Sequence, residues 1–309
     1  MPALSILLGG ALTSLARAYV RYAPCPVGKR TLWLRLLEPA MGRRPHRRVA
    51  RTAHGSMIAC DTRDLIQRRL YGFGVWEPDL TRWIATRLEP GDTFVDVGAN
   101  IGYYALLAAK RVGRSGAVVA VEASPRIFAM LQDNLVRNRA HNVRAVNIAI
   151  SDRPGVATLF SGPSWHIGLT STVEVPDSAF ECEIPTAPLR EILQPEEVAT
   201  ARLVKIDIEG DEWSAVKGLV PLLGLLRPEA EIVVEVHPEG LSQRGHGAED
   251  FMRVLVDAGY HVYELHNRAL ESYLSPYIRE RPVRIAEPSL RIIAKRTWLC
   301  FSRLDAEHL

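Results

Sequence analysis

The residues of this chain with the clearest chemical meaning form one glycine-rich turn. The apolar run Val95-Asp96-Val97 leads directly into Gly98-Ala99-Asn100-Ile101-Gly102. Glycines let the backbone approach a ligand closely, and the start of a following helix offers free N–H groups. A dinucleotide site would favour the spacing G-x-G-x-x-G, and its diphosphate would be repelled by Asp96. The observed spacing beside an acid suits a cationic or hydroxyl-bearing ligand instead.

A second acid, Glu122, follows the next apolar run, Ala117–Val121. A carboxylate at the end of a second strand lies where a ribose diol would sit, because two adjacent hydroxyls can donate to its two oxygens. Together with the preceding turn, Glu122 predicts a nucleoside-binding site, and adenosyl ligands meet this description.

Alternating strands and helices must position these residues. Strands are expected at 93–97, 117–121, 143–150, 203–208, 232–236, 260–265 and 297–302. Helices are expected at 103–111, at 124–138 with Ser124 as the N-cap, from 211, and at 248–258. Repeated strand–helix units predict a mostly parallel sheet with helices on both faces and ligands at the carboxyl ends of its strands.

These motifs resemble the FkbM family of S-adenosylmethionine-dependent methyltransferases. The resemblance rests on Asp96, Gly98, Asn100, Gly102 and Glu122, on Glu77-Pro78, and above all on Lys205-Ile206-Asp207-Ile208-Glu209-Gly210. It covers about residues 51–265 and implies an α/β, Rossmann-like class I methyltransferase fold with a seven-stranded sheet. It also implies S-adenosylmethionine as cofactor and O-methylation of a hydroxyl on a sugar, glycolipid or polyketide-type small molecule.

The resemblance assigns expected roles by position. Gly98, Asn100 and Gly102 would line the amino-acid and ribose end of the cofactor, Asp96 would order the turn, and Glu122 would bind the ribose. Ala149, Ile150 and Ser151 would face the adenine, Asp207 would lie near the sulfonium or the methionine amine, and Glu77 would belong to the same cofactor site.

An alcohol acceptor also needs a base, and His237, expected at the end of the strand beside Asp207, is the candidate. A structural histidine in a strand-end turn is the alternative. Asp207, Glu209, Glu235 and His237 could together hold a divalent metal, but ion pairs with Lys205 or with arginines explain these acids as easily, and the metal interpretation is not favoured.

The chain divides into three expected parts: an N-terminal extension (1–53), a lead-in segment (54–90) with a strand at 56–61 and a helix at 82–88, and the methyltransferase domain (91–309). Residues 154–200 interrupt the strand–helix rhythm and predict a substrate-side insertion, chiefly a loop with short β-like pieces. Trp165 and His166 of this insertion could contact the acceptor, or could simply anchor the loop.

Charge is divided unevenly along the chain. Residues 1–53 hold ten of the 38 basic residues and one acid, Glu38, although the net charge of the whole chain is only +3. The run Arg43–Arg51 is expected to be a solvated stretch rather than an anion site. Leu4, Leu8, Leu12, Leu15 and Tyr19 recur at helical spacing, which predicts an amphipathic helix packed on the domain, with a membrane surface as the second interpretation.

Other classes of function fit less well. This chain lacks the G-x-G-x-x-G spacing expected of a NAD-dependent oxidoreductase. It also lacks the N-P-P-Y motif of a base-methylating enzyme, and no nucleic-acid partner is expected. A non-catalytic binding module stays open as an alternative. The four cysteines show neither metal-finger nor disulfide spacing, which favours a cytoplasmic location with peripheral membrane contact through residues 1–50 as an open alternative.

Overall fold

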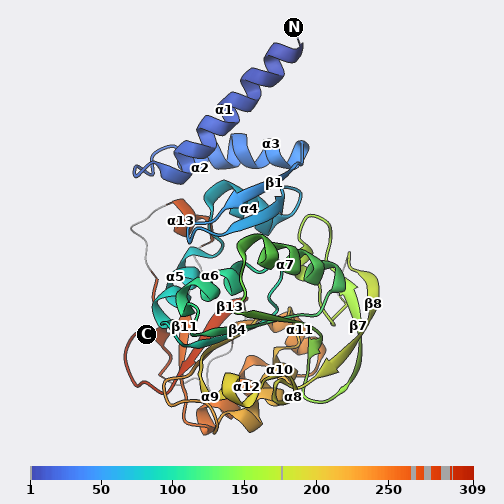
Figure 1. Cartoon of the computed structure of the whole chain (residues 1–309), viewed down its shortest axis with the longest axis vertical. Helices are drawn as coiled ribbons and strands as arrows, with labels where there is room; N and C mark the ends of the chain where they lie inside the picture. The colour runs from blue at the N-terminus through green and yellow to red at the C-terminus, as the bar shows by residue number, and fades with distance from the viewer. Residues whose placement is uncertain (1, 175–176, 266–268, 275–279, 287–292, 294) are drawn as a thin grey trace.

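A large mixed sheet carries the residues singled out above (Figure 1). The computed structural model describes residues 2–174, 177–265, 269–274, 280–286, 293 and 295–309, with residues 2–11 and 269 described by their backbone alone. The sheet has eight strands in the order β12-β11-β13-β10-β9-β3-β4-β5. Neighbours among β3, β4, β5, β9 and β10 are parallel, whereas β13 runs antiparallel to both β10 and β11.

The strands of this sheet are β3 (Thr93–Val97), β4 (Ala117–Glu122), β5 (Val143–Asn147), β9 (Ala201–Ile206), β10 (Glu231–Val236), β11 (His261–Leu265), β12 (Val283–Arg284) and β13 (Thr297–Ser302). All seven strands expected from the sequence are present, and the eighth, β12, adds two residues at the edge. The chain passes from β3 to β4 on one side and returns to β9 on the other. This reversal places a ligand crevice between the carboxyl ends of β3 and β9.

Helices cover both faces of the sheet, as predicted. The helices of the domain are α5 (Pro78–Arg87), α6 (Tyr103–Val112), α7 (Pro125–Asn138), α8 (Leu189–Ile192), α9 (Pro195–Ala199), α10 (Glu212–Leu219), η3 (Val220–Leu222), α11 (Pro238–Gln243), α12 (Ala248–Asp257) and α13 (Ala269–Leu274). Alternate strand residues face opposite cores: Phe94 and Val118 pack with α5 and α6, while Val95 and Val119 pack with α10 and α12. The Ser124 hydroxyl accepts from the Ile127 N–H, confirming the N-cap of α7.

The third strand is shorter than expected, and this prediction was wrong beyond residue 147. Residues 143–150 read as one apolar run, but β5 ends at Asn147, whose side chain donates to the carbonyls of Glu122 and Ala123. The next residues, β6 (Ala149–Ile150), join a separate three-stranded sheet in the order β6-β8-β7.

The insertion is more regular than a loop with short β-like pieces. It contains β7 (Gly155–Ser161), η2 (Ile167–Leu169) and β8 (Ala179–Ala187), and β7 pairs antiparallel with β8. Because β6 pairs with β8, the insertion is hydrogen-bonded to the end of the β5–β6 segment.

The N-terminal elements form a layer on top of the domain (Figure 1). They are α1 (Pro2–Tyr22), α2 (Lys29–Leu32), η1 (Trp33–Leu37), α3 (Glu38–Arg43), β1 (Arg47–Arg51), β2 (Met57–Asp61) and α4 (Leu65–Phe73). Part of the basic run is thus a strand, although its arginines are exposed as expected. β1 pairs with β2, so the expected boundary at residue 53 falls inside a hairpin that joins the extension to the lead-in segment. All four cysteines are free.

Candidate functional site

The turn after β3 is closed by backbone hydrogen bonds. The N–H groups of Gly98 and Ala99 both donate to the Val121 carbonyl at 2.9 Å. Gly98 has φ +78°, and a Cβ there would lie 1.7 Å from the carbonyl oxygen of Asp207. Only glycine therefore allows the ends of β3 and β9 to approach this closely. Gly102 is the N-cap of α6 and has φ +89°.

Glu122 lies at the end of β4 and faces this turn. Its carboxylate accepts from the Asn100 N–H at 2.8 Å and from the Ser124 N–H at 2.9 Å. Burial raises the pKa of Glu122 to about 7. The carboxylate is thus held rigidly at the position that the sequence predicted for a ribose-binding group.

Asp96 does not reach the ligand space but lies behind it. The Lys205 ammonium is 3.2 Å from Asp96 and 3.1 Å from Asp207, and it also donates to the Gly98 carbonyl at 3.4 Å. Asp96 and Lys205 are both essentially inaccessible to solvent. Lys205 therefore ties the turn to both strand ends, and a buried charge is compensated by pairing.

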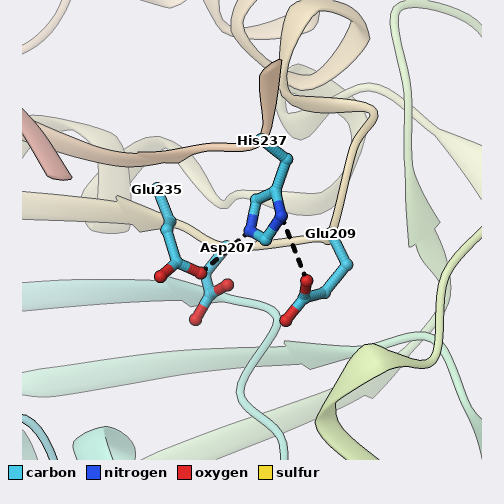
Figure 2. A group of neighbouring side chains, drawn as sticks. All are labelled: Asp207, Glu209, Glu235 and His237. Carbon is cyan, nitrogen blue, oxygen red and sulfur yellow. Dashed lines mark hydrogen bonds and ion pairs between the residues drawn. The ribbon is translucent and has the colours of Figure 1, made fainter. Parts of the chain in front are cut away.

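The carboxyl ends of β9 and β10 carry a cluster of charged side chains. Figure 2 shows the His237 imidazole between the carboxylates of Glu235 and Glu209, with Asp207 below them. His237 Nε2 lies 3.0 Å from Glu235, and Nδ1 lies 3.3 Å from Glu209. Arg296, which directly precedes β13, donates to Glu209 at 2.8 Å and also to Glu235.

The ionisation of this cluster follows from these pairs. Burial alone would lower the pKa of His237, but Glu209 and Glu235 raise it to about 9. Burial would raise the pKa of Glu235, but Arg296 and His237 together hold it well below its usual range. Burial raises the pKa of Asp207 well above its usual range, against the opposing effect of Lys205. His237 is therefore a cation at neutral pH.

Glu77 enters the same region from the start of α5. Its carboxylate accepts from the Tyr104 hydroxyl at 2.7 Å and from the Trp298 indole N–H at 3.0 Å. Burial, followed by repulsion from Glu235, raises the pKa of Glu77 to about 7. The Glu77 carboxylate, at the start of α5, is thus held in place by side chains from α6 and β13.

A single pocket connects these groups. Its free space, counted together with the open solvent at its mouth, is about 800 Å³. One end is largely apolar and contains Val97, Val121, Glu122, Ile127, Ala149, Ile150 and Leu159. The other end is polar and contains Glu77, Thr170, Thr172, Asp207, Glu209, Glu235 and Arg296.

The loop of the insertion closes one side of this pocket. The Leu65 N–H donates to the Trp165 carbonyl, and the Ile167 N–H donates to Asp64, both at 2.8 Å. The Ser171 hydroxyl donates to the Glu209 carbonyl at 2.7 Å. The loop is therefore attached to the start of α4 on one side and to the charged cluster on the other.

The backbone around the pocket holds conformations that cost energy. Five non-glycine residues have positive φ within the described part of the chain, and three of them, Glu77 (+39°), Asn100 (+49°) and Glu209 (+59°), line the pocket. Such conformations cost on the order of 1–3 kcal/mol each and cluster at functional sites. This observation marks the pocket as a functional site independently of any sequence motif.

Comparison with known families agrees with this geometry. The model of the FkbM methyltransferase domain matches residues 96–262, more than half of the chain. The chain belongs to the FkbM methyltransferase family. This membership confirms the resemblance inferred from the motifs.

Two characterised relatives of the FkbM domain are similar over part of their length. The 31-O-demethyl-FK506 methyltransferase of Streptomyces tacrolimicus is 32% identical over 163 residues, covering 43% of this chain and 61% of that protein. The hexuronic acid methyltransferase of Haloferax volcanii is 27% identical over 161 residues, covering 52% of this chain and 62% of that protein. The matches thus span about three-fifths of each relative.

Among solved structures, Aeropyrum pernix fibrillarin with bound S-adenosylmethionine shows a TM-score of 0.41 and 14% identity, covering 82% of this chain and 92% of that chain. The fold class of the FkbM domain is established here by its strand order and its helices on both faces of the sheet.

The residues expected to form the FkbM cofactor site are brought together in most cases. Of those residues, the pocket is lined by Glu77, Gly98, Asn100, Glu122, Ala149, Ile150 and Asp207. Asp96, Gly102 and Ser151 do not line it: Asp96 orders the turn through Lys205, Gly102 begins α6, and Ser151 follows β6. The binding roles of the lining residues stay predictions.

The contacts of His237 do not favour it as the general base. Both of its ring nitrogens face carboxylates, which raise its pKa to about 9, and His237 does not line the pocket. Its role as the base stays a prediction. His166 does line the pocket. Burial lowers the pKa of His166 to about 4, so its ring is neutral, and its buried Nδ1 makes no hydrogen bond to a described residue.

Sequence reasoning missed Arg296, which is the central cation of the charged cluster.

Four possible metal ligands, those of Asp207, Glu209, Glu235 and His237, lie within 4.8 Å of one another. The Arg296 guanidinium already lies against Glu209 and Glu235, so a divalent ion held by these ligands would compete with it. The ion pairs that the sequence analysis weighed against a metal are present, from Lys205 to Asp207 and from Arg296 to Glu209 and Glu235. The interpretation without a metal stays a prediction.

Proposed function

We propose that this chain is an S-adenosylmethionine-dependent O-methyltransferase acting on a hydroxyl of a sugar, glycolipid or polyketide-type small molecule. One observation carries the proposal. A single pocket is lined by Asn100 of the turn after β3 and by Glu122 at the end of β4. The same pocket is lined at its polar end by Arg296 and by the carboxylates of Glu77, Asp207, Glu209 and Glu235. A nucleoside cofactor and a hydroxyl-bearing acceptor could thus meet in one enclosed space.

The apolar end of the pocket suits an adenosyl group. Val121, Ile127 and Ile150 offer flat apolar surface, and the Glu122 carboxylate has oxygens that can accept from a ribose diol. Asp207 and Glu77 also line the pocket, and a bound sulfonium and amine would favour the ionised forms of these two buried carboxyl groups. When bound, S-adenosylmethionine supplies an activated methyl group, and the protein has to position the acceptor and exclude water.

The polar end suits a neutral acceptor with several hydroxyls. Nη2 of Arg296 donates to Glu209 and Glu235, while Nε and Nη1 donate to no described residue. The Arg296 side chain is 41% exposed and lines the pocket, so these donors are open to a ligand. Because two carboxylates flank the guanidinium, an anionic acceptor is repelled more than a polyol, whose hydroxyls both donate and accept.

The relatives support the same class of reaction. One is named for a methyl transfer on FK506 and the other for methylation of a hexuronic acid. For the proton of the acceptor hydroxyl, we assign the accepting role to His166, because its imidazole lines the pocket. A bound acceptor would have to raise the lowered pKa of this ring for efficient proton transfer. His237 then acts as a positioning residue for Glu209 and Glu235.

Calorimetric titration with S-adenosylmethionine and S-adenosylhomocysteine tests the cofactor. We expect both to bind, NAD to fail, and Glu122→Gln to weaken binding by about tenfold through loss of a charge-assisted hydrogen bond. Glu249→Gln, at a carboxylate outside the pocket, should bind as the unmodified chain does. Failure of both adenosyl ligands to bind the unmodified chain would overturn the proposal.

Transfer of a labelled methyl group tests the acceptor. Neutral glycosides, uronic acids and macrolide alcohols form the panel, and we expect methyl ether formation with a neutral polyhydroxyl compound. His166→Gln should lower kcat by about 100-fold, the usual effect of losing a general base, without altering cofactor affinity. Cofactor binding without transfer to any hydroxyl would instead support the non-catalytic module.

A further inference from the structure

The C-terminal half of α1 exposes a stripe of apolar side chains. Leu12, Leu15, Tyr19 and Tyr22 are 57%, 70%, 37% and 71% exposed. Their spacing of three, four and three residues places them on one face of a helix. This finding corrects the sequence prediction, in which Leu12, Leu15 and Tyr19 belonged to the face that packs on the domain; the side chains of Leu4 and Leu8 lie outside the described residues.

A neighbouring face of α1 already makes the contact with the domain. Ala16 and Val20 are buried in a small core with Trp33, Leu37, Met41, Phe73 and Leu274. The Arg17 guanidinium lies 4.4 Å from the centre of the Tyr71 ring and donates to the Tyr71 carbonyl. The attachment of α1 is therefore complete without the stripe, and the helix projects away from the body of the molecule (Figure 1).

The elements that accompany α1 in the N-terminal layer carry exposed arginines. α1 packs against α2, η1 and α4, and the same N-terminal layer carries Arg30, Arg35, Arg43, Arg44, Arg47 and Arg48, all exposed. Glu38 is the one acid among residues 1–53. Of these arginines, Arg30 and Arg47 pair with Glu271 and Asp61, and the other four make no ion pair with a described residue. The surface thus combines apolar and aromatic side chains with strong positive charge.

We infer that this N-terminal face, formed by the α1 stripe and these arginines, binds the surface of an anionic phospholipid bilayer. Leu12 and Leu15 would enter the boundary between headgroups and acyl chains, Tyr19 and Tyr22 would lie at headgroup level, and the arginines would contact lipid phosphates. None of the described helices combines the length and hydrophobicity that a membrane span requires. The interaction is therefore peripheral.

Charge argues for a lipid surface over a second copy of the chain. Two copies that met through this face would bring two sets of arginines together, and like charges across an interface oppose association. An anionic bilayer is complementary to both components of the face. The affinity should fall as salt concentration rises, because exposed charges are screened.

Vesicle co-sedimentation tests the inference. The full chain is mixed with phosphatidylcholine vesicles, with or without phosphatidylglycerol. We expect association with the anionic vesicles only, reduced by about tenfold or more in Leu15→Asp and in Arg43→Glu/Arg44→Glu. Leu225→Asp controls for the added acid, because Leu225 is 66% exposed and lies outside the N-terminal face. Arg111→Glu/Arg114→Glu controls for the altered net charge.

The outcomes separate the possible partners. Urea unfolding of each variant verifies that the fold is intact. Equal association with neutral vesicles, no association at all, or an equal loss in the control variants would contradict the inference. A different result would identify the stripe as a protein interface and would contradict the inference. The unmodified chain would then not bind vesicles, and sedimentation velocity without vesicles would show a dimer that Leu15→Asp dissociates.

Discussion

At the scale of single residues, Lys205 links the two sides of the crevice. Its ammonium is paired with Asp96 on β3 and with Asp207 just after β9. Asp96 is wholly buried and has no access to solvent as an alternative partner. The charge on Lys205 is therefore a condition for keeping Asp96 ionised inside the protein.

Replacement of this lysine should be costly. We expect Lys205→Met to lower the free energy of unfolding by about 3–5 kcal/mol, because it leaves a buried carboxylate without a counter-charge. Lys217→Met removes an equally short pair, 3.0 Å from Asp152, but its lysine side chain is 55% exposed, so the loss should stay below about 1 kcal/mol. Urea denaturation of both variants makes the comparison, and equal losses would contradict it.

The sequence predicted the turn and its acids because they lie in one contiguous motif. Gly98, Asn100 and Glu122 occupy the places expected from strand–turn–helix order. Arg296 could not be predicted in this way, because it joins Glu235 only through the antiparallel register of β13, in which Val236 pairs with Thr297. The raised pKa of His237 depends on its contacts with Glu209 and Glu235, which the sequence analysis grouped with it only as possible metal ligands.

At the scale of elements, the approach of β3 and β9 depends on one glycine. Gly98→Ala places a methyl group against the Asp207 carbonyl, and a backbone atom cannot move aside as a flexible side chain can. We expect a loss of at least about 3 kcal/mol of unfolding free energy, together with loss of adenosyl-ligand binding.

Gly259→Ala is the matched control for backbone conformation. Gly259 also has positive φ, at +86°, but nothing lies within 4 Å of its Cβ position. The control should cost about 1–2 kcal/mol, the usual penalty for a left-handed non-glycine residue. Thermal unfolding ranks the two variants, and a similar Tm for both would show that crowding at Gly98 is unimportant.

Elements with a strong local signal were predicted well, and those set by distant partners were not. Seven strands and the N-cap of α7 follow from apolar runs and from Ser124. The end of β5 could not be predicted from the local sequence, because no glycine or proline interrupts residues 143–150. β6 leaves the main sheet to pair with β8, a strand about 35 residues away, and pairing at that distance leaves no mark on a local pattern.

At the scale of the whole molecule, the stability of the fold should depend on pH through His237. The folded-state pKa of about 9 lies above the ordinary value of 6.5. The stabilisation from its charge is fully present below pH 6.5 and is lost as the pH rises through 9. The expected loss is on the order of 3 kcal/mol.

The difference between the unmodified chain and His237→Gln isolates this effect from other groups that titrate at alkaline pH. Urea unfolding at about pH 6 and about pH 9.5 should show a stability gap that narrows at the higher value. A gap of constant size would mean that the imidazole is neutral in the folded protein.

The pairing of β6 with β8 has a consequence for engineering. Ala149 and Ile150 line the pocket and are also a strand of the small sheet, in register with Thr186 and Ala187. An exchange of the whole insertion with that of a relative would cut this pairing and disturb the wall beneath it. The loop from Gly162 to Thr170 offers a safer graft, because its ends are already joined by the hydrogen bond from the Gly162 N–H to the Thr170 hydroxyl. New acceptor preferences should therefore be sought by transplanting this short loop with His166 retained and β8 left untouched.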